Sequence, residues 1–281
     1  MLIAGVQMDV EVGAVAANLD RMEQRLSEAA GQGAKLVVFP ECAATGYCFE
    51  SAAEAREVAE PIPGPITERM SKLCRSHGTH TAFGMVELDG ERIFNAAVLV
   101  GPEGVLGAYR KIHLPYLGLD MFTTPGDRLF RVDHVGNVRV GMTICYDGSF
   151  PESTRSLALL GADLILLPTN WPPGAETTAE YVTNARAVEN NVYFMAVNRV
   201  GTERGFRFIG HSKIADPHGN TLAEARGTDE QILYAEIDPH KARRKHLVRV
   251  PGRHEIDRMA DRRPEMYGLL TEPHHLRSPG R

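Results

Sequence analysis

The stretch VRVGMTICYDGSFPE (138–152) decides how the middle of this chain folds. Its first seven residues form a short apolar run rich in β-branched side chains, which is typical of a buried strand. Gly148 supplies a tight turn, Ser149 is a candidate helix N-cap, and Pro151 suits the first turn of a helix. The stretch therefore predicts a strand, a sharp turn and a helix, with Cys145 at the turn.

A cysteine at such a turn has two interpretations. Free cysteine is among the most frequently buried residue types, so Cys145 taken alone is most simply a core residue. A thiol near backbone N–H groups and the positive end of a helix dipole is instead stabilised as the thiolate, which is the nucleophilic form. This second interpretation predicts a lowered thiol pKa, and it needs support from residues elsewhere in the chain.

The composition is that of an ordinary globular protein. The 281 residues are 43% hydrophobic and 24% charged, and their net charge is −5. This acidic balance gives no reason to expect nucleic acid as a partner, and no uncharged run approaches the roughly 20 residues that cross a bilayer. The N-terminus shows no signal peptide, and the four cysteines lack CxxC spacing. We therefore expect a cytoplasmic protein with reduced thiols that binds neither nucleic acid nor membrane.

Strand and helix patterns alternate along most of the chain. Amphipathic helices are predicted over 17–33, 64–78, 151–160 and 176–190. Strands are predicted at the N-terminus and over 35–40, 81–88, 92–100, 105–114, 162–168, 192–198, 211–225 and 231–238. A further pair of strands, joined by a Gly136-Asn137 turn, is predicted over 128–145. Because about a dozen strands exceed one average sheet, we expect an α/β fold in which two mixed sheets pack face to face with helices outside.

The domain organisation predicted from the sequence is simple. No low-complexity linker divides the chain, so 1–270 is expected to form a single domain. The remaining residues, 271–281, are rich in Pro, His and Arg, which indicates a free tail or an arm onto a neighbouring subunit.

Three ionisable residues follow predicted strands at their carboxyl ends, where open α/β sheets bind ligands. They are Glu41, Lys111 and Cys145. Each alone is more simply a solvated or a core residue. Together they form a usable set, because a carboxylate serves as general base and acid, an ammonium stabilises a developing oxyanion, and a thiolate is a nucleophile.

The motifs around these residues resemble a known superfamily. LVVFPECAATGY, YRKIHLP and GMTICYDGSFPE are similar to the three signature regions of the nitrilase superfamily of carbon–nitrogen hydrolases. LLPTNWP, TNARAVENNVYFMAVNRVG, GHSKIADPHGN and RRPEMYGLL extend the similarity over nearly the whole chain. The resemblance implies a four-layer αββα sandwich, pairing into homodimers or larger assemblies, and a catalytic triad of Glu41, Lys111 and Cys145. It implies no metal and no organic cofactor.

Two further roles follow from the resemblance. The oxyanion is expected to be held by Lys111 and by the backbone N–H of Tyr146. Family members often carry a second glutamate a few residues beyond the lysine, and the stretch KIHLPYLGLDMFTTPGD has none. Asp120 is the nearest acid in this stretch, and its side chain is one methylene shorter than that of glutamate. Asp120 either replaces the second glutamate or is a solvated loop residue.

The residues that follow Cys145 differ from those of nitrilases and carbamoylases, which favours an amidase that acts on a small or medium carboxamide. Nitrilases proper tend to follow the nucleophile with Trp-Glu, and carbamoylases tend to have arginines there, whereas this chain has YDGS. Side chains near the strand ends are candidates for the substrate pocket: Tyr47, Tyr116, Asn170 and Trp171. For Tyr47, core packing is the slightly preferred alternative. For Trp171, which lies in a Pro-rich loop, the pocket is preferred.

Several alternatives remain at this point. One is hydrolysis of nitriles or N-carbamoyl compounds, and another is a catalytically silent binding or scaffold protein on the same fold. Cys42 is not the expected nucleophile, because no turn and helix start follow it. The basic stretch HKARRKHLVRVPGR (240–253) is interpreted as a solvated helix end rather than a nucleic-acid patch.

Overall fold

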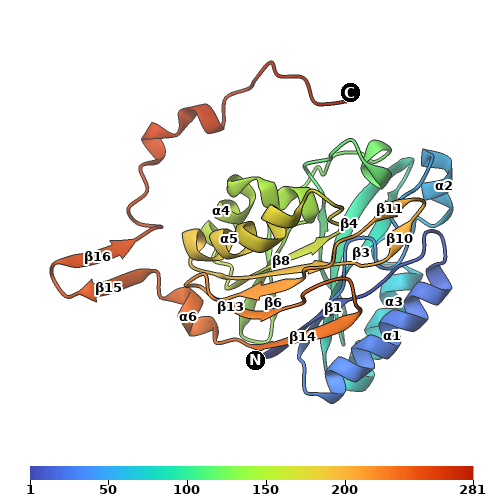
Figure 1. Cartoon of the computed structure of the whole chain (residues 1–281), viewed down its shortest axis with the longest axis horizontal. Coiled ribbons are helices and arrows are strands. Elements are labelled where there is room, and N and C mark those ends of the chain that lie inside the picture. The colour runs from blue at the N-terminus through green and yellow to red at the C-terminus, as the bar shows by residue number, and fades with distance from the viewer. Residues whose placement is uncertain (281) are drawn as a thin grey trace.

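The computed structural model describes residues 1–280, and its centre is a pair of six-stranded mixed sheets (Figure 1). In spatial order the first sheet contains β14 (Gln231–Glu236), β1 (Leu2–Gln7), β2 (Leu36–Val38), β3 (His80–Asp89), β4 (Arg92–Gly101) and β5 (Gly104–Arg110). The second contains β13 (Thr221–Glu224), β12 (Lys213–Ala215), β9 (Tyr193–Asn198), β8 (Leu164–Thr169), β7 (Val138–Met142) and β6 (Val132–Val135). The prediction of two mixed sheets is confirmed.

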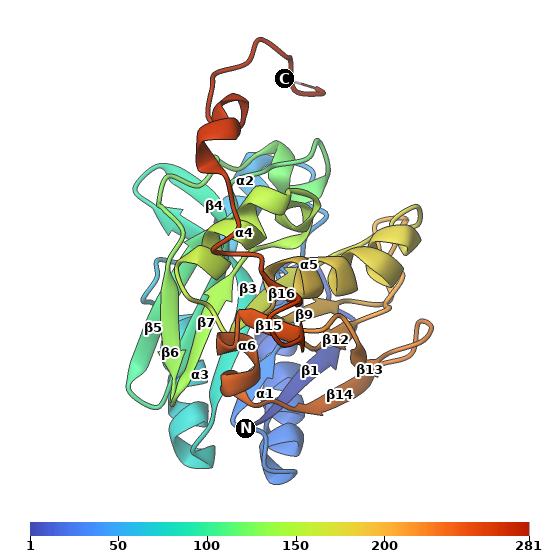
Figure 2. The same ribbon diagram turned by 90° about the vertical axis from the view of Figure 1, so that its left-hand side faces the viewer.

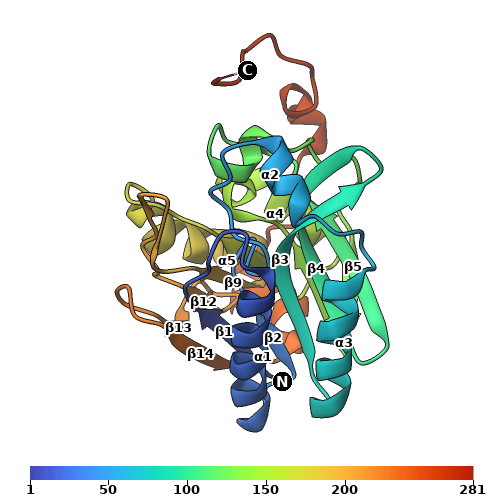
Figure 3. The ribbon, with the colours of Figure 1, turned by 90° about the vertical axis from the view of Figure 1, so that its right-hand side faces the viewer.

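Helices cover the outer face of each sheet, which completes the predicted αββα sandwich. On the first sheet, α1 (Val15–Gly31) and α3 (Pro65–His77) run side by side, as Figure 3 shows. On the second, α4 (Pro151–Leu159) and α5 (Thr183–Asn190) lie on the opposite side of the molecule (Figure 1). A single π-helical turn (Thr178–Val182) leads into α5, so the predicted helix over 176–190 is also confirmed.

Apolar stripes on the helices explain why they pack where they do. The apolar stripes of α1 and α3 form one buried cluster with side chains of β1 and β2. The helices contribute Leu19, Met22 and Leu26 from α1, and Ile66 and Met70 from α3. Fully burying such a side chain contributes about 1.5–3 kcal/mol each. His77, the last residue of α3, has helical spacing with this stripe but is exposed. The predicted N-cap of α4 was also wrong: Phe150 occupies that position, and Ser149 ends the preceding turn.

The main core lies between the two sheets. Both sheets contribute inward-facing apolar residues to one cluster, among them Val38, Leu99, Val140, Leu166 and Met195. Central and edge strands both contribute to this core, and the central strands, with both faces covered, appear in the sequence as continuous apolar runs.

Strand directions bring three carboxyl ends to one end of the sandwich. In the first sheet β2 pairs parallel to β3, and two antiparallel pairings, β3 with β4 and β4 with β5, return β5 to the direction of β2. Glu41 and Lys111 therefore follow strands that end at the same edge. In the second sheet β7 runs parallel to β8, so Cys145 and the end of β8 also lie together.

The last part of the chain leaves the sandwich as an arm (Figures 1 and 2). It starts after α6 (Pro239–Arg243) with the hairpin of β15 (His246–Val250) and β16 (His254–Asp257) and continues into two short 3-10 turns. The basic stretch 240–253 is thus a helix end only in α6 and becomes a strand beyond it. The chain departs from the sandwich before residue 271, where the sequence placed the start of the tail. No helix within 1–280 combines the length and apolar character that a membrane span requires.

Candidate active site

Glu41 lies in a tight turn that follows β2 and rests directly on β3. At Gly84 of β3, a Cβ atom would lie 2.1 Å from the main-chain nitrogen of Cys42. The N–H of Gly84 donates to the Pro40 carbonyl, and the Gly84 carbonyl accepts from Ala44. Glycine permits this close approach of two backbones because it has no side chain. The result is a Glu41 carboxylate that is only 1% exposed.

Lys111 joins two carboxylates at the end of β5. Its Nζ donates to Glu41 Oε1 at 2.7 Å and to Asp120 Oδ2 at 2.5 Å, and all three side chains are fully buried. Asp120 is brought there by the short 3-10 helix Gly118–Met121. Asp120 is therefore not a solvated loop residue, and it occupies the place beside the lysine for which the sequence offered no glutamate.

Two uncharged residues complete the hydrogen bonding of these carboxylates. Asn95 Nδ2 donates to Glu41 Oε1 at 2.8 Å and to Asp120 Oδ1 at 2.9 Å. The hydroxyl of Tyr47 donates to Asp120 Oδ2 at 2.8 Å. Tyr47 fits because Gly118, at φ +50°, presents no Cβ, which would lie 2.5 Å from the ring. Tyr47 thus packs in a core cluster and still reaches the site with its hydroxyl.

Sequence reasoning missed Asn95, although the sequence contains a signal for it. Asn95 is a polar residue within the otherwise apolar run IFNAAVLV of β4. A buried amide is costly unless it is hydrogen-bonded, so such a residue predicts polar partners nearby.

The ionisation of the lysine and glutamate follows from this arrangement. Burial alone lowers the pKa of Lys111, but Asp120 and Glu41 outweigh it and hold that pKa well above its ordinary value. Burial raises the pKa of Glu41, and Lys111 and Asn95 oppose this rise while Asp120 adds to it. The pair is therefore a charged lysine beside a carboxylate that accepts a proton more readily than a solvated glutamate.

Cys145 occupies a strained turn directly after β7. Its φ of 44° is rarely adopted by residues other than glycine, and such strain is concentrated at functional sites. Asp147 holds the turn: its Oδ2 accepts from the Ile144 N–H at 3.0 Å and from the Tyr109 hydroxyl at 2.8 Å, and its Oδ1 pairs with the His113 ring at 2.7 Å. A 3-10 turn over Cys145–Ser149 separates the cysteine from α4.

The predicted lowering of the thiol pKa was wrong. Burial, followed by the nearby Glu41 carboxylate, raises the pKa of Cys145 to about 12, although Lys111, Thr169 and Asn170 act in the opposite direction. The reason is geometric: the helix N-terminus begins only at Pro151, and the lysine charge is already balanced by two carboxylates. The resting nucleophile is therefore a thiol, and it needs a base to become reactive.

This protonated resting state makes a testable prediction. The difference in thiolate ultraviolet absorbance between the wild type and Cys145→Ser should show no titration step below about pH 10, because the folded protein disfavours the anion. A step near neutral pH would instead indicate the thiolate–ammonium pair that the sequence suggested, and it would remove the need for proton transfer to Glu41.

The structure places the four predicted pocket residues differently. Asn170, directly after β8, is buried, and neither its amide nitrogen nor its amide oxygen has a hydrogen-bond partner within residues 1–280. Tyr116 is 58% exposed and lines a cavity of about 360 Å³ with neighbours that include Leu117 and Gly118. Trp171 is only 4% exposed and packs in the core under α4 and α5, so it is not the open loop aromatic that was expected.

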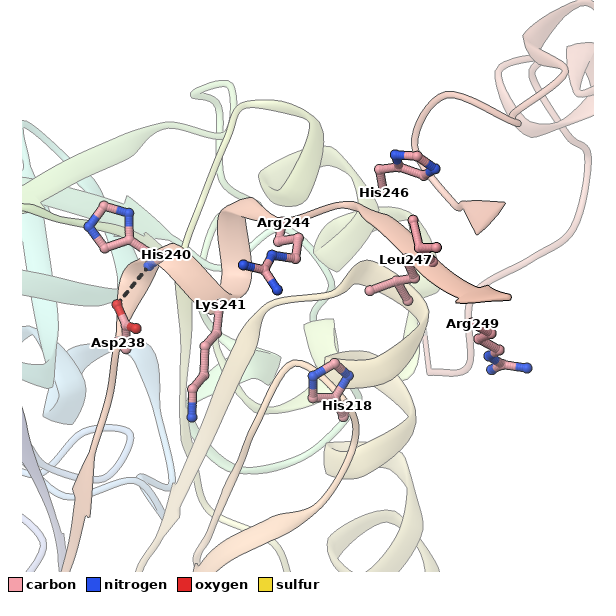
Figure 4. A pocket seen from close by; sticks show the side chains of 9 residues that line it. His218, Asp238, His240, Lys241, Arg244, His246, Leu247 and Arg249 are labelled. Carbon is pink, nitrogen blue, oxygen red and sulfur yellow. Dashed lines mark hydrogen bonds between the residues drawn. The ribbon is translucent and has the colours of Figure 1, made fainter. Parts of the chain in front are cut away.

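A larger cavity lies elsewhere, between α6, β15 and the turn that precedes β13. Its volume is about 870 Å³, and the residues that line it are mainly basic and exposed, as Figure 4 shows for Lys241, Arg244 and His218. It contains no member of the predicted triad. Across the described residues, no group of three or more His, Cys, Asp or Glu side chains is arranged to hold a metal ion. The chemistry, rather than cavity size, therefore locates the candidate site.

Comparison with known proteins agrees with this geometry. The family model described as carbon–nitrogen hydrolase matches residues 2–246. The chain belongs to the carbon–nitrogen hydrolase family. A carbon–nitrogen hydrolase named nitrilase, from Pyrococcus abyssi, is 42% identical over 266 residues, which cover 94% of this chain and 98% of the relative. An (R)-stereoselective amidase from Pseudomonas sp. is 36% identical over 277 residues, covering 97% of this chain and 95% of the relative.

Solved carbon–nitrogen hydrolases have the same fold. A crystal structure of an amidase from Nesterenkonia sp. superposes with a TM-score of 0.80 at 26% identity over 96% of each chain. Another structure, of a mutant of the amidase from Nesterenkonia sp. AN1, has acrylamide added at its active site cysteine; its TM-score is 0.80 at 26% identity, over 96% of this chain and 99% of that one. The chain is thus a carbon–nitrogen hydrolase of the nitrilase superfamily with the αββα fold.

Proposed function

We propose that this enzyme hydrolyses a small or medium carboxamide to the carboxylic acid and ammonia, through a thioester on Cys145. One observation carries the proposal. Glu41 Oε1 is occupied by Lys111 and Asn95, whereas Glu41 Oε2 is buried without a hydrogen-bond partner among residues 1–280. The carboxylate also lies close enough to Cys145 to raise the pKa of the thiol. A free carboxylate oxygen beside a protonated thiol is the arrangement that general-base activation requires.

In the first half of the reaction, Glu41 Oε2 takes the thiol proton as the sulfur attacks the amide carbon. The oxyanion is held by the backbone N–H of Tyr146 and by Lys111, whose ammonium has three N–H donors of which the two carboxylates use two. One such donor is typically worth about 3–4 kcal/mol in the transition state. The carbon–nitrogen bond then breaks, Glu41 gives its proton to the nitrogen, and ammonia leaves.

In the second half, Glu41 acts as a base again. It takes a proton from water, and the resulting hydroxide equivalent attacks the thioester carbon. Lys111 and the Tyr146 N–H hold the second oxyanion. The carbon–sulfur bond breaks, the carboxylic acid leaves, and the proton on Glu41 returns to the sulfur of Cys145. Protons balance over the cycle, with no group required beyond the chain and water.

The names of the relatives support a carboxamide but leave a second candidate. One similar protein is an (R)-stereoselective amidase, and a structural neighbour from Nesterenkonia sp. is also an amidase, which favours amides. The relative from Pyrococcus abyssi is named a nitrilase, which favours nitriles as the second candidate. The unpaired buried amide of Asn170 supports either substrate, since it offers both a donor and an acceptor next to the nucleophile.

Ammonia release from a panel of amides, nitriles and N-carbamoyl compounds tests the proposal. We expect turnover of one or more aliphatic amides and a covalent acyl adduct in the intact mass of the enzyme. Turnover of nitriles alone would replace the amide with the second candidate. No ammonia from any compound would favour a silent binding protein on this fold and would overturn the proposal.

We also propose that the enzyme is a homodimer or a larger homo-oligomer that works in the cytoplasm. The arm carries apolar side chains that the rest of the chain does not cover: Met266, Leu269, Leu270 and Leu276 are each more than half exposed. Two neighbouring leucines at the end of α4, Leu159 and Leu160, are also exposed, so a second copy offers complementary apolar surface. The four cysteines are unpaired, which supports a reducing compartment.

Deleting residues 263–281 should convert the oligomer to monomers, because it removes most of this exposed apolar surface. Light scattering coupled to gel filtration measures the change. The point variant Leu269→Glu is expected to weaken assembly in the same direction while it leaves the sandwich intact. A full-length chain that is already monomeric at micromolar concentration would contradict the proposal of an oligomer.

A further inference from the structure

We propose that Asn95 is a positioning residue for the acid–base step, and that it selects which oxygen of Glu41 carries the proton. This inference rests on the proposed function, because it concerns the same base. Asn95 lies in the middle of β4 and is 1% exposed. Its side-chain nitrogen bonds to Glu41 and Asp120, so Asn95 acts on the reaction through these neighbours.

Asn95 is hydrogen-bonded to all three charged residues of the site: to the carboxylates of Glu41 and Asp120, and to the main chain of Lys111. The side-chain nitrogen of Asn95 donates to Glu41 Oε1 at 2.8 Å and to Asp120 Oδ1 at 2.9 Å. Its main-chain oxygen accepts the N–H of Lys111 at 2.8 Å. The turn after β2, the end of β5 and the 3-10 helix of Asp120 are therefore tied to one position on β4.

The orientation of the amide is itself fixed. The thiol of Cys42 donates to Asn95 Oδ1 at 3.6 Å, so the oxygen faces the cysteine and the NH₂ group faces the two carboxylates. Burial raises the pKa of Cys42 well above its ordinary value, which keeps this thiol protonated and able to donate. Cys42 thus has a place in the site as a support for Asn95 rather than as a nucleophile.

The two carboxylate oxygens of Glu41 have different hydrogen-bond partners. Its Oε1 receives two N–H donors, from Lys111 and Asn95, while its Oε2 receives none from the described chain. The terminal torsion of a glutamate is broad and roughly two-fold, so a single donor would hold the carboxylate loosely. Two donors on Oε1 fix the carboxylate and leave Oε2 as the oxygen available to accept a proton.

Asn95 also affects the charge that the site can hold. Two ionised carboxylates and one ammonium carry a net charge of −1 in a buried place, and N–H donors stabilise the ionised forms. The hydrogen bond from Asn95 acts to lower the pKa of Glu41. The titratable groups that interact with Glu41 come from three other elements and from its own segment after β2: Lys111, Asp120 and Cys145, and Cys42 and Tyr47.

Asn95→Leu tests the inference, since leucine has a similar size and supplies no donor. We expect kcat/KM for amide hydrolysis to fall about tenfold or more, and its acid limb to move to higher pH by about one unit, because the limb reports protonation of the free enzyme's base. Asn95→Ser, which keeps one hydroxyl donor, should give an intermediate shift and keeps the test usable if the leucine variant does not fold.

Asn190→Leu is the matched control. Asn190 is also fully buried, and its amide donates to the Arg186 carbonyl at 3.0 Å and to the Glu189 carboxylate at 3.3 Å, on α5 and away from the triad. This variant should lower thermal stability and leave the acid limb in place. If the Asn95 variants likewise change only stability and keep the wild-type limb, Asn95 is a structural residue and the inference is overturned.

A second readout separates this inference from the proposed function. The rate at which iodoacetamide alkylates Cys145 depends on proton transfer to Glu41 and needs no natural substrate. Its pH profile should shift in Asn95→Leu as the hydrolysis profile does. If the alkylation profile shifts in Asn95→Leu but the wild type hydrolyses no amide, the role of Asn95 stands and the amidase proposal is wrong. If the wild type hydrolyses amides but the alkylation profile does not shift in Asn95→Leu, the amidase proposal stands and the role of Asn95 is wrong.

Discussion

Replacing Cys145 with alanine is expected to abolish amide hydrolysis, with a loss of at least about 10⁴-fold in kcat. The loss should fall on kcat, because the sulfur forms the covalent intermediate and no other group in the site replaces it. The fold should survive, since the change removes one atom from a partly exposed residue. Ammonia release and intact mass measure the two consequences: no turnover and no acyl adduct.

Cys74→Ala is the matched control for this variant. Its thiol is buried on the inner side of α3, donates to the Val100 carbonyl at 3.8 Å and has no contact with the triad among the described interactions. Activity should therefore remain at the wild-type level. Turnover by Cys145→Ala, or an acyl adduct that peptide mapping assigns to Cys42, would show that the nucleophile has been misidentified.

The sequence predicted the layers of the fold because each layer is encoded locally. The helical period of 3.6 residues predicted α1 and α3, and continuous apolar runs predicted the central strands. The errors lie at ends, such as the N-cap at Phe150, and in short elements, such as the helix Ala52–Glu57, which was not predicted. The arm was predicted less well, because its hairpin over 246–257 has exposed side chains and no core to impose a period.

The sequence indicated the three candidate triad residues, but neither Asn95 nor the electrostatics of the site. The motifs locate Glu41, Lys111 and Cys145, since each follows a strand end. The pKa of Cys145 depends on a balance in which burial and the Glu41 carboxylate raise it and Lys111 lowers it, and these groups lie on segments far apart in the sequence. Local sequence contains no information on that balance, so a helix dipole argument gave the wrong direction.

Replacing Lys111 with methionine is the second large effect we expect, and it acts on stability as well as activity. The oxyanion loses its cation, so hydrolysis should be lost. Glu41 and Asp120 would then face each other in a buried site without a counter-charge, and removing one partner of a buried ion pair costs about 3–5 kcal/mol. Thermal or urea unfolding at neutral pH measures the second effect.

The pH dependence of unfolding shows whether repelling carboxylates cause the lost stability of Lys111→Met. Burial and the neighbouring Asp120 already raise the pKa of Glu41, and removing Lys111 takes away the charge that most opposes this rise. The folded state then binds more protons than the unfolded state, so the stability of Lys111→Met should fall as pH rises and recover on acidification. A deficit that is independent of pH would point to lost packing of the lysine chain instead.

The double variant Lys111→Met/Asp120→Asn separates structure from catalysis. Removing one carboxylate together with the ammonium leaves a single buried charge that Asn95 and the new amide group can solvate, so much of the lost stability should return. Activity should not return, because neither residue supplies a cation to the oxyanion. A double variant that regained both would mean that Lys111 serves only to neutralise its carboxylates, and the oxyanion would then depend on the Tyr146 N–H and the unpaired amide of Asn170.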